Sequence, residues 1–294
     1  MKNAKFINVD GIKTRYFEAG KGDPLVLIHG GHFGSYYNAY HWSLNFDDLA
    51  SHFRVLALDK IGQGHTDNPN SDGDYTMTKT IEHVYGFLRS AGAEKVALMG
   101  HSRGALPAAR IAADHPDLVK AVILLDTNTL AADHPSTPTN FYAKLDENPP
   151  PTPNEEFVRR EPEANSYSKT HITADFVEEM LAIARLPKIL EARKKTEQLM
   201  NRQFIPDARK NKYETLDMIR DGRLKAPTLI LWGLNDPSAP VVLGHQLFQH
   251  ISYAVPRTQF HVFNHAGHYV FREHARELDR LVVNFVQEAT TGSV

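Results

Sequence analysis

The chain has 294 residues, of which 41% are hydrophobic, and its formal net charge at pH 7 is −2. This composition allows a sizeable buried core, and the absence of a basic stripe argues against a nucleic-acid-binding protein. The sequence contains no cysteine, which excludes disulfide bonds, a thiol nucleophile and a cysteine-ligated metal.

The sequence shows neither a membrane segment nor a targeting segment. No apolar stretch approaches the roughly 20 residues that cross a bilayer, and the first six residues lack the apolar core of a signal peptide. We therefore expect a cytoplasmic protein that acts on a small molecule and binds neither membrane nor nucleic acid. A homo-oligomer is left open.

Short apolar runs alternate with helix-like segments through the first 126 residues. The chain opens with a predicted β-hairpin around the turn dipeptide Asp10-Gly11. Buried strands are predicted in PLVLIHGG, RVLALDKIGQG, KVALMG and KAVILLD, the first two running into glycine-rich loops. Helices are predicted in TMTKTIEHVYGFLRSAG and RGALPAARIAADHP, the first of them capped by Thr76 or Thr78. Such repetition indicates a parallel sheet with helices on both faces.

The pattern changes after Asp126 and resumes about a hundred residues later. Residues 133–165 are rich in proline, and the helical pattern that follows is interrupted at Pro187. Strand patterns return with APTLILWG and QFHVFNH. A helix is predicted between them near 241–251, and a closing helix after them. We predict one α/β core domain from residues 1–127 and 225–294, with a mostly helical insertion at 128–224. The proline-rich stretch is predicted to be mobile or to wrap the surface, and EARKKTEQ to be a solvated helix face.

The stretch VALMGHSRGALPAAR places Ser102 between two glycines, where a strand ends and a helix begins. This is the G-x-S-x-G pattern of a nucleophile elbow, whose sharp turn strains the serine backbone. Gly100 and Gly104 remove side chains that would collide where strand and helix approach. The N–H of Arg103, at the helix N-terminus, is a candidate oxyanion donor. The alternative is a tight-turn serine without chemistry.

A serine nucleophile needs a base and an acid that orients the base. Asp236 and His268 each follow a predicted strand, so they are expected at the same sheet edge as Ser102. Asp126, at the end of another strand, is the alternative acid, and His265 is the competing base. These residues predict a Ser102–His268–Asp236 triad.

The glycine-rich loop after the first buried parallel strand is expected to supply a second oxyanion donor. The candidates are the N–H groups of Gly31 and His32. Loss of one such donor typically costs about 2.7–4 kcal/mol of transition-state stabilisation. The spacing of His32, His41 and His101 matches no zinc pattern, so we predict no metal site and no cofactor.

At this point the sequence resembles the α/β-hydrolase superfamily over nearly its whole length. The resemblance is carried by His29-Gly30-Gly31, Asp59 with Gly62 and Gly64, the elbow Gly100–Gly104, Asp236 and His268. It implies a mostly parallel eight-stranded sheet with helices on both faces, and it implies that the 128–224 insertion is a lid over the substrate pocket. Dehalogenases and epoxide hydrolases of this superfamily have aspartate at the nucleophile position, where this chain has Ser102.

Within the superfamily the chain looks most similar to meta-cleavage-product hydrolases, which cleave carbon–carbon bonds, and to related monoalkyl phthalate ester hydrolases. The carbon–carbon hydrolases usually have Asn before the nucleophile and Trp after the triad histidine; here these positions hold His101 and Tyr269. They also bind the substrate dienoate with a lid arginine. A rough alignment puts Met180 at that position, with Arg185 near.

We therefore predict a serine hydrolase that cleaves a small ester of an aromatic or anionic acid, such as a monoalkyl phthalate, through an acyl-enzyme. Arg103, His32 and Tyr269 are the candidate substrate-binding residues, because a guanidinium beside the nucleophile can pair with a carboxylate. The alternative for Arg103 is a structural salt bridge. The alternative functions are carbon–carbon hydrolysis of a 2-hydroxy-6-oxo-dienoate and a non-catalytic binding protein.

Overall fold

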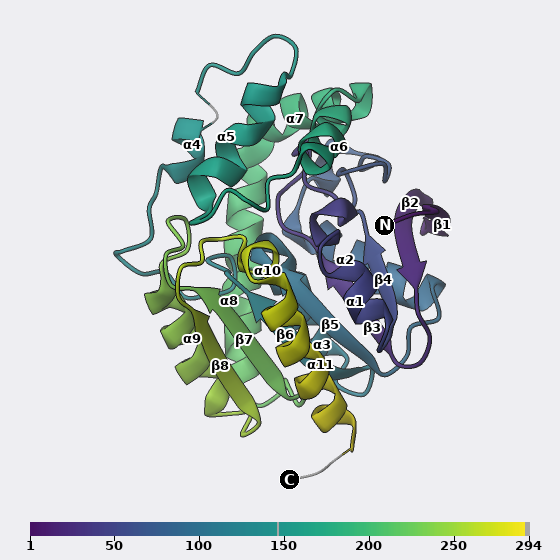
Figure 1. Cartoon of the computed structure of the whole chain (residues 1–294), viewed down its shortest axis with the longest axis vertical. Helices are drawn as coiled ribbons and strands as arrows, with labels where there is room; N and C mark the ends of the chain where they lie inside the picture. The colour runs from purple at the N-terminus through teal and green to yellow at the C-terminus, as the bar shows by residue number, and fades with distance from the viewer. Residues whose placement is uncertain (146, 292–294) are drawn as a thin grey trace.

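The computed structural model describes residues 1–145 and 147–291, and their strands form one eight-stranded sheet in the order β1-β2-β4-β3-β5-β6-β7-β8 (Figure 1). The strands are β1 (Lys5–Val9), β2 (Ile12–Ala19), β3 (Pro24–Ile28), β4 (Arg54–Leu58), β5 (Val96–His101), β6 (Val119–Leu125), β7 (Thr228–Gly233) and β8 (Thr258–Phe263). Strands β3 to β8 are parallel to one another. Strand β1 pairs antiparallel with β2, and β2 pairs antiparallel with β4. The predicted mostly parallel sheet is confirmed.

The helices occupy the connections between strands and the chain beyond β8. They are α1 (Phe46–Ala50), α2 (Met77–Ser90), α3 (Ala105–Asp114), α4 (Phe141–Leu145), α5 (Glu155–Asn165), α6 (Ala174–Ala184), α7 (Pro187–Leu199), α8 (Ile205–Arg220), α9 (Val241–Ser252), α10 (Val270–Glu273) and α11 (Ala275–Thr291). Thr76 caps α2 by accepting a hydrogen bond from the N–H of Lys79. Pro187 begins α7, where its missing N–H costs no helical hydrogen bond.

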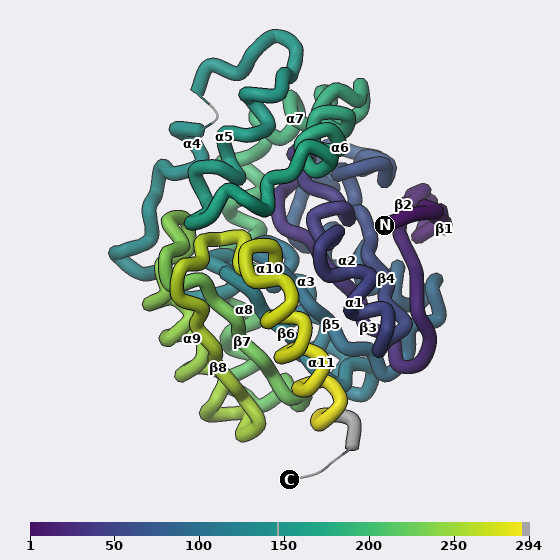
Figure 2. The backbone as a smooth tube through the Cα atoms, in the orientation of Figure 1, coloured from purple at the N-terminus to yellow at the C-terminus, as the bar shows by residue number. Residues whose placement is uncertain are grey.

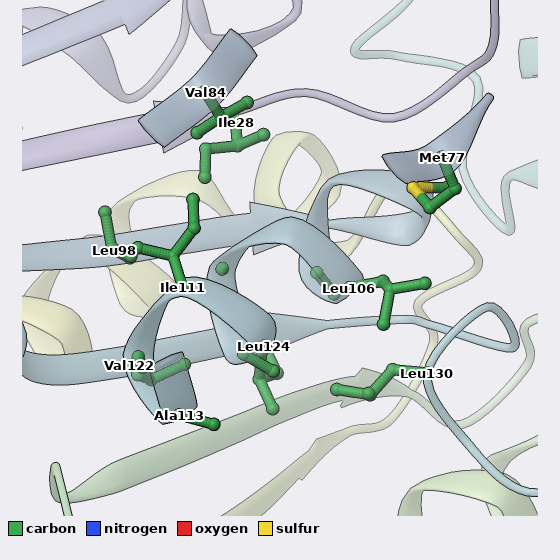
Figure 3. Close-up of a cluster of buried hydrophobic side chains, with 14 of the residues drawn as sticks. Ile28, Met77, Val84, Leu98, Leu106, Ile111, Ala113, Val122, Leu124 and Leu130 are labelled. Carbon is green, nitrogen blue, oxygen red and sulfur yellow. The ribbon is translucent and has the colours of Figure 1, made fainter. Parts of the chain in front are cut away.

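Helices cover both faces of the sheet, which explains why the central strands read as continuous apolar runs. One hydrophobic cluster lies between the sheet and α2, α3, α8 and α9, and a second lies on the opposite face, under α1 and α11. Figure 3 shows part of the first cluster, in which Leu98 and Val122 of the sheet face Leu106 and Ile111 of α3. These contacts fix the position of α3, and with it the turn that precedes the helix.

The register of the central strands aligns their carboxyl ends. His101, the last residue of β5, pairs with Leu125 of β6, which in turn pairs with Leu231 near the end of β7. The residues that follow β5, β6 and β7 therefore emerge at one edge of the sheet, as expected for parallel strands whose loops carry a site.

Between β6 and β7 the described residues form helices and loops without a strand. Helices α4 to α7 stack at one end of the molecule, and the tube view shows the chain returning from them through α8 (Figure 2). Helix α8 packs against α2, α3 and α9. The 128–224 boundaries of a lid remain a prediction, and α8, which lies inside them, packs with the helices that cover the sheet.

The proline-rich stretch contains more regular structure than its sequence predicts. Helices α4 and α5 form within it, and α5 includes Pro162 in its interior. Asn154 caps α5 by accepting a hydrogen bond from the N–H of Phe157. In the described part of the chain, none of the helices has the length and apolar character needed to cross a membrane.

Candidate active site

The strand-to-helix turn after β5 holds Ser102 in a left-handed backbone conformation with φ of +53°. Few non-glycine residues adopt this region, and those that do are concentrated at functional sites. A Cβ on Gly104 would overlap the carbonyl oxygen of Ile28, and a Cβ on Gly100 would overlap the backbone of Gly104. The two glycines therefore allow the close approach that sets this turn.

Asp236 and His268 form a buried pair beyond the ends of β7 and β8. The Nδ1 of His268 lies 2.6 Å from Oδ2 of Asp236. The other carboxylate oxygen accepts hydrogen bonds from the N–H groups of Ser238 and Ala239, both at 2.8 Å. These contacts fix the carboxylate, which fixes the ring of His268 and the tautomer that presents Nε2.

Two opposing effects act on the pKa of His268. Burial lowers it, while the negative charge of Asp236 and the hydrogen bond to it raise it, and the net effect is a raised pKa. The positive form of the ring is thus stabilised beside Asp236, as a base that accepts a proton requires.

The Nε2 atom of His268 is buried and has no hydrogen-bond partner among the described residues. The ring centroid of His268 lies 4.7 Å from that of His101, the residue that precedes Ser102. The Nε2 of His101 lies 2.9 Å from the carbonyl oxygen of His268. The structure therefore brings His268 beside the elbow, with an unused acceptor, but without a hydrogen bond to Ser102.

The alternative acid and the alternative base lie in other surroundings. Asp126 has a φ of +43°, and its carboxylate accepts the N–H of Gly233, which ties the end of β6 to the end of β7. His265 is exposed and stacks on Tyr167, with a centroid distance of 4.9 Å. Neither residue pairs with His268 or Ser102 in the described part of the chain.

The loop after β3 lies against the elbow. Gly31 has a φ of +73°, and a Cβ at this position would overlap Ser35, Tyr37 and Gln63. Both Gly31 and His32 line the same cavity as Ser102. Burial and the nearby Arg103 lower the pKa of His32 to about 3, so that its ring is neutral near pH 7. The two candidate oxyanion donors on this loop stay candidates.

A cavity of about 410 Å³ lies between the sheet edge and the helices of the insertion. Its lining comes from the β3 loop, the elbow, helices α4, α5 and α7 and the π-helical turn that follows α7. It includes Gly31, His32, Ser35, Tyr37, Ser102, Arg103, Tyr142, Glu161, Arg193, Thr196, Glu197 and Met200. A volume of this order is typical of small-molecule sites.

Two guanidinium groups line this cavity. Arg103 lies beside the nucleophile candidate, with Cζ 5.7 Å from the centroid of Phe204. Arg193 of α7 stacks over Phe157 at 4.7 Å and lies 3.4 Å from a carboxylate oxygen of Glu197. The cavity lining therefore includes two arginines, together with the carboxylate side chains of Glu161 and Glu197.

The rough alignment puts Met180 at the position of the lid arginine, with Arg185 near, and neither residue lines the cavity. Met180 is buried in a hydrophobic cluster, and Arg185 is exposed, with its Nε donating to the carbonyl of Pro153. Arg193 lines the cavity instead. It belongs to EARKKTEQ, so the prediction of a solvated face is wrong for the side of α7 that carries Arg193.

Tyr269 lies behind the cavity wall. Its side chain is fully buried, and its hydroxyl contacts the hydroxyl of Tyr37 at 2.7 Å and donates to Glu161. Tyr37 and Glu161 themselves line the cavity. Burial raises the pKa of Glu161, although hydrogen bonds from Tyr269 and Asn165 act in the opposite direction. Sequence analysis did not single out Glu161, since nothing in a proline-rich stretch marks one carboxylate as buried.

A family model described as alpha/beta hydrolase fold matches residues 23–275. The 2-hydroxy-6-oxo-6-(2'-aminophenyl)hexa-2,4-dienoic acid hydrolase of Metapseudomonas resinovorans is 27% identical over 285 residues, covering 96% of this chain and 90% of the relative. The 2-hydroxy-6-oxo-6-phenylhexa-2,4-dienoate hydrolase of Comamonas testosteroni is 28% identical over 277 residues, covering 93% and 91%. A solved structure of the meta-cleavage product hydrolase from Pseudomonas fluorescens IP01 shares 25% identity, with a TM-score of 0.79 over 97% of this chain and 98% of that one.

Proposed function

The chain is a hydrolase that belongs to the alpha/beta hydrolase fold family, and from this membership we propose that it cleaves a carbon–carbon bond in a carboxylate-bearing ring-fission product, a 2-hydroxy-6-oxo-dienoate. The observation that carries the proposal is the match, over nearly the whole chain, to two dienoate hydrolases, and the cavity that contains Ser102 is lined by Arg103 and Arg193. We propose that these arginines bind the substrate carboxylate while the carbonyl further along the substrate lies at Ser102.

In the proposed first step the Oγ of Ser102 adds to the ketone carbon of the substrate. The Nε2 of His268, which has no hydrogen-bond partner among the described residues, takes the hydroxyl proton, and Asp236 stabilises the resulting positive ring. The negative charge forms on the former ketone oxygen. The N–H groups of Arg103 and of Gly31 or His32 are the proposed donors to that oxygen.

In the second step the intermediate collapses, and the bond between the ketone carbon and the neighbouring carbon breaks. For the electron pair to have a sink, the 2-hydroxyl proton must first move to the leaving carbon, which gives the 2-oxo form of the substrate with a tetrahedral carbon beside the ketone. The pair released on cleavage then spreads through the remaining double bond to the 2-oxo oxygen, which takes the proton held by His268. The acyl group stays on Ser102 as an ester. Water, deprotonated by His268, then attacks this ester and releases the carboxylic acid.

The sequence analysis predicts ester hydrolysis and gives carbon–carbon cleavage as the alternative. The relatives favour carbon–carbon cleavage. Both curated relatives described above are dienoate hydrolases, and each alignment covers at least 90% of both chains. The monoalkyl phthalate prediction has no support beyond the general hydrolase fold. The carbon–carbon hydrolases that this sequence resembles bind the dienoate with an arginine of the lid. Arg193, in the insertion of this chain, lines the cavity.

Ester hydrolysis remains the second candidate because of two positions near the elbow. His101 and Tyr269 stand where the carbon–carbon hydrolases usually have Asn and Trp. Both side chains are fully buried, and their rings lie 6.1 Å apart between the elbow and His268. An anionic ester would use the same guanidinium groups and the same triad.

The experiment that separates these functions follows two reactions of the purified protein. One sample receives 2-hydroxy-6-oxo-6-phenylhexa-2,4-dienoate and is followed by loss of its yellow colour, and another receives monobutyl phthalate and is followed by acid release. We expect bleaching at least 100-fold faster, in kcat/KM, than ester cleavage, and no bleaching with Ser102→Ala. Cleavage of the phthalate monoester without bleaching would contradict the proposal and favour the second candidate.

A further inference from the structure

Lys60 follows β4, and its side chain is only 1% exposed. Its Nζ donates a hydrogen bond of 3.0 Å to the carbonyl oxygen of Gly31. In the described part of the chain, no carboxylate pairs with this nitrogen. Burying a lysine without a carboxylate partner is costly, so a lysine at this position calls for an explanation.

Gln63, three residues later, contacts the same glycine-rich loop and is also buried. Its Nε2 lies 3.3 Å from the carbonyl oxygen of Gly30 and 2.8 Å from the hydroxyl of Ser35. The carbonyl of Gly62 accepts the N–H of Gly34 at 3.0 Å. The loop after β4 therefore holds the loop after β3 along several consecutive residues.

The two carbonyl groups held in this way belong to the peptides that carry the candidate oxyanion donors. The carbonyl of Gly30 is in one peptide unit with the N–H of Gly31, and the carbonyl of Gly31 with the N–H of His32. The peptide unit is planar, and none of the described peptides is cis, so fixing the carbonyl fixes the direction of the opposite N–H. A hydrogen bond to the carbonyl also polarises the unit and strengthens its N–H as a donor.

We propose that Lys60 and Gln63 are positioning residues of the oxyanion site, which hold the Gly30–His32 peptides from behind. Neither side chain lines the cavity, so neither contacts the substrate. The inference rests on the proposed function, because it assumes that an oxyanion forms beside these peptides. Burial and the nearby Arg103 lower the pKa of Lys60, and a donor to the Gly31 carbonyl remains in either protonation state.

Lys60→Met tests the inference, because it keeps the length and removes the donor. We expect kcat on an activated p-nitrophenyl ester to fall about 10- to 100-fold with KM changed less than two-fold, as for a lost oxyanion contact. Affinity for a phenylboronic acid, whose serine adduct carries the tetrahedral oxygen, should fall by a similar factor. Binding of a planar competitive product should stay unchanged.

Lys188→Met is the matched control, since the Nζ of Lys188 also donates at 3.0 Å to a loop glycine carbonyl, that of Gly64. It should leave kcat and boronate affinity unchanged. The inference is overturned if Lys60→Met folds and keeps kcat and boronate affinity within two-fold of wild type. It is also overturned if the substitution changes only KM. Gln63→Met, which removes the donor to Gly30, tests the same claim by the same readouts if Lys60→Met does not fold.

A spectroscopic readout separates this inference from the proposed function. If wild type shows no activity that depends on Ser102, the proposed function is wrong, and the amide nitrogen of His32 still reports on the peptide. With histidine labelled with nitrogen-15, we expect Lys60→Met to shift the His32 amide resonance, because the hydrogen bond to its peptide carbonyl is lost. Lys188→Met should not shift it. An unchanged resonance in Lys60→Met overturns the positioning role.

Discussion

Two effects of opposite sign act on the pKa of the buried His268 ring: burial and the neighbouring Asp236. Burial alone would favour the neutral ring, whereas the carboxylate at 2.6 Å favours the charged one and prevails. The ring must be neutral to accept the serine proton, so activity should be lost as the pH falls through the raised pKa. The acid side of the rate profile therefore reports directly on this pair.

We predict that kcat/KM on a neutral activated ester falls at acidic pH with a midpoint above 6.5, the ordinary histidine value. Asp236→Asn removes the charge, so the midpoint should move to lower pH, and kcat should fall by about 10⁴ because the tautomer is no longer fixed. The measurement is a pH–rate profile of both proteins. A midpoint that does not move on substitution would show that Asp236 does not set the pKa of the titrating base.

At the scale of elements, the turn from β5 to α3 depends on backbone contacts that leave no space for a methyl group. Gly104→Ala would force its Cβ against the carbonyl of Ile28, which cannot move without disturbing β3. We expect a loss of more than about 2 kcal/mol in the free energy of unfolding. Gly73→Ala is the control, because its added Cβ would meet nothing closer than the hydroxyl of Ser71 at 3.5 Å. Urea denaturation of both variants decides the point, and equal stabilities would contradict it.

Helix α7 brings a cation from the insertion to the cavity. If Arg193 binds the substrate carboxylate, Arg193→Met should raise KM for a carboxylated substrate about 10- to 100-fold, as for loss of a charged hydrogen bond. KM for a neutral ester of similar size should stay within two-fold. Arg185→Met, an exposed arginine two residues before the same helix, should change neither. Equal effects of Arg193→Met on charged and neutral substrates would remove the carboxylate role.

The strands, the elbow and the helices outside the proline-rich stretch were predictable, because each depends on local patterns of apolar residues, glycines and caps. The positions of Arg193 and Glu161 in the cavity lining were not predictable from such patterns. The helical period predicts that Arg193, Thr196 and Glu197 share one face of α7, but it carries no information on whether that face meets solvent or a cavity. Glu161 lies in a helix that its prolines concealed, and Lys60 gains its role only from the approach of two loops.

At the scale of the whole molecule, a buried carboxyl group couples stability to pH. Asp279 of α11 is 1% exposed, and its Oδ1 accepts a hydrogen bond of 2.9 Å from Asn45, beside α1. Burial raises its pKa to about 8, although the Asn45 hydrogen bond acts in the opposite direction. The folded state therefore holds this proton more tightly than the unfolded chain does. The stability from this group is fully present below pH 3.8 and is lost as the pH rises through about 8.

We predict that Asp279→Asn removes this dependence, because the amide has nothing to titrate. The wild-type free energy of unfolding should fall, relative to that of the variant, by at most about 1.4 kcal/mol for each pH unit between pH 5 and 8. Denaturation with urea at pH 5, 6.5 and 8 measures the difference, in which the contributions of other groups cancel. A difference that is constant with pH would show that Asp279 titrates normally.

The central claim is that Ser102, served by His268 and Asp236, is the nucleophile in the cavity under the inserted helices. Reaction of the protein with a fluorophosphonate, followed by mass spectrometry of its peptides, tests this claim most directly. We predict a single adduct on Ser102, with labelling at least 100-fold slower in His268→Ala. A folded wild-type protein that takes up no label, or takes it up at another residue, would contradict the claim.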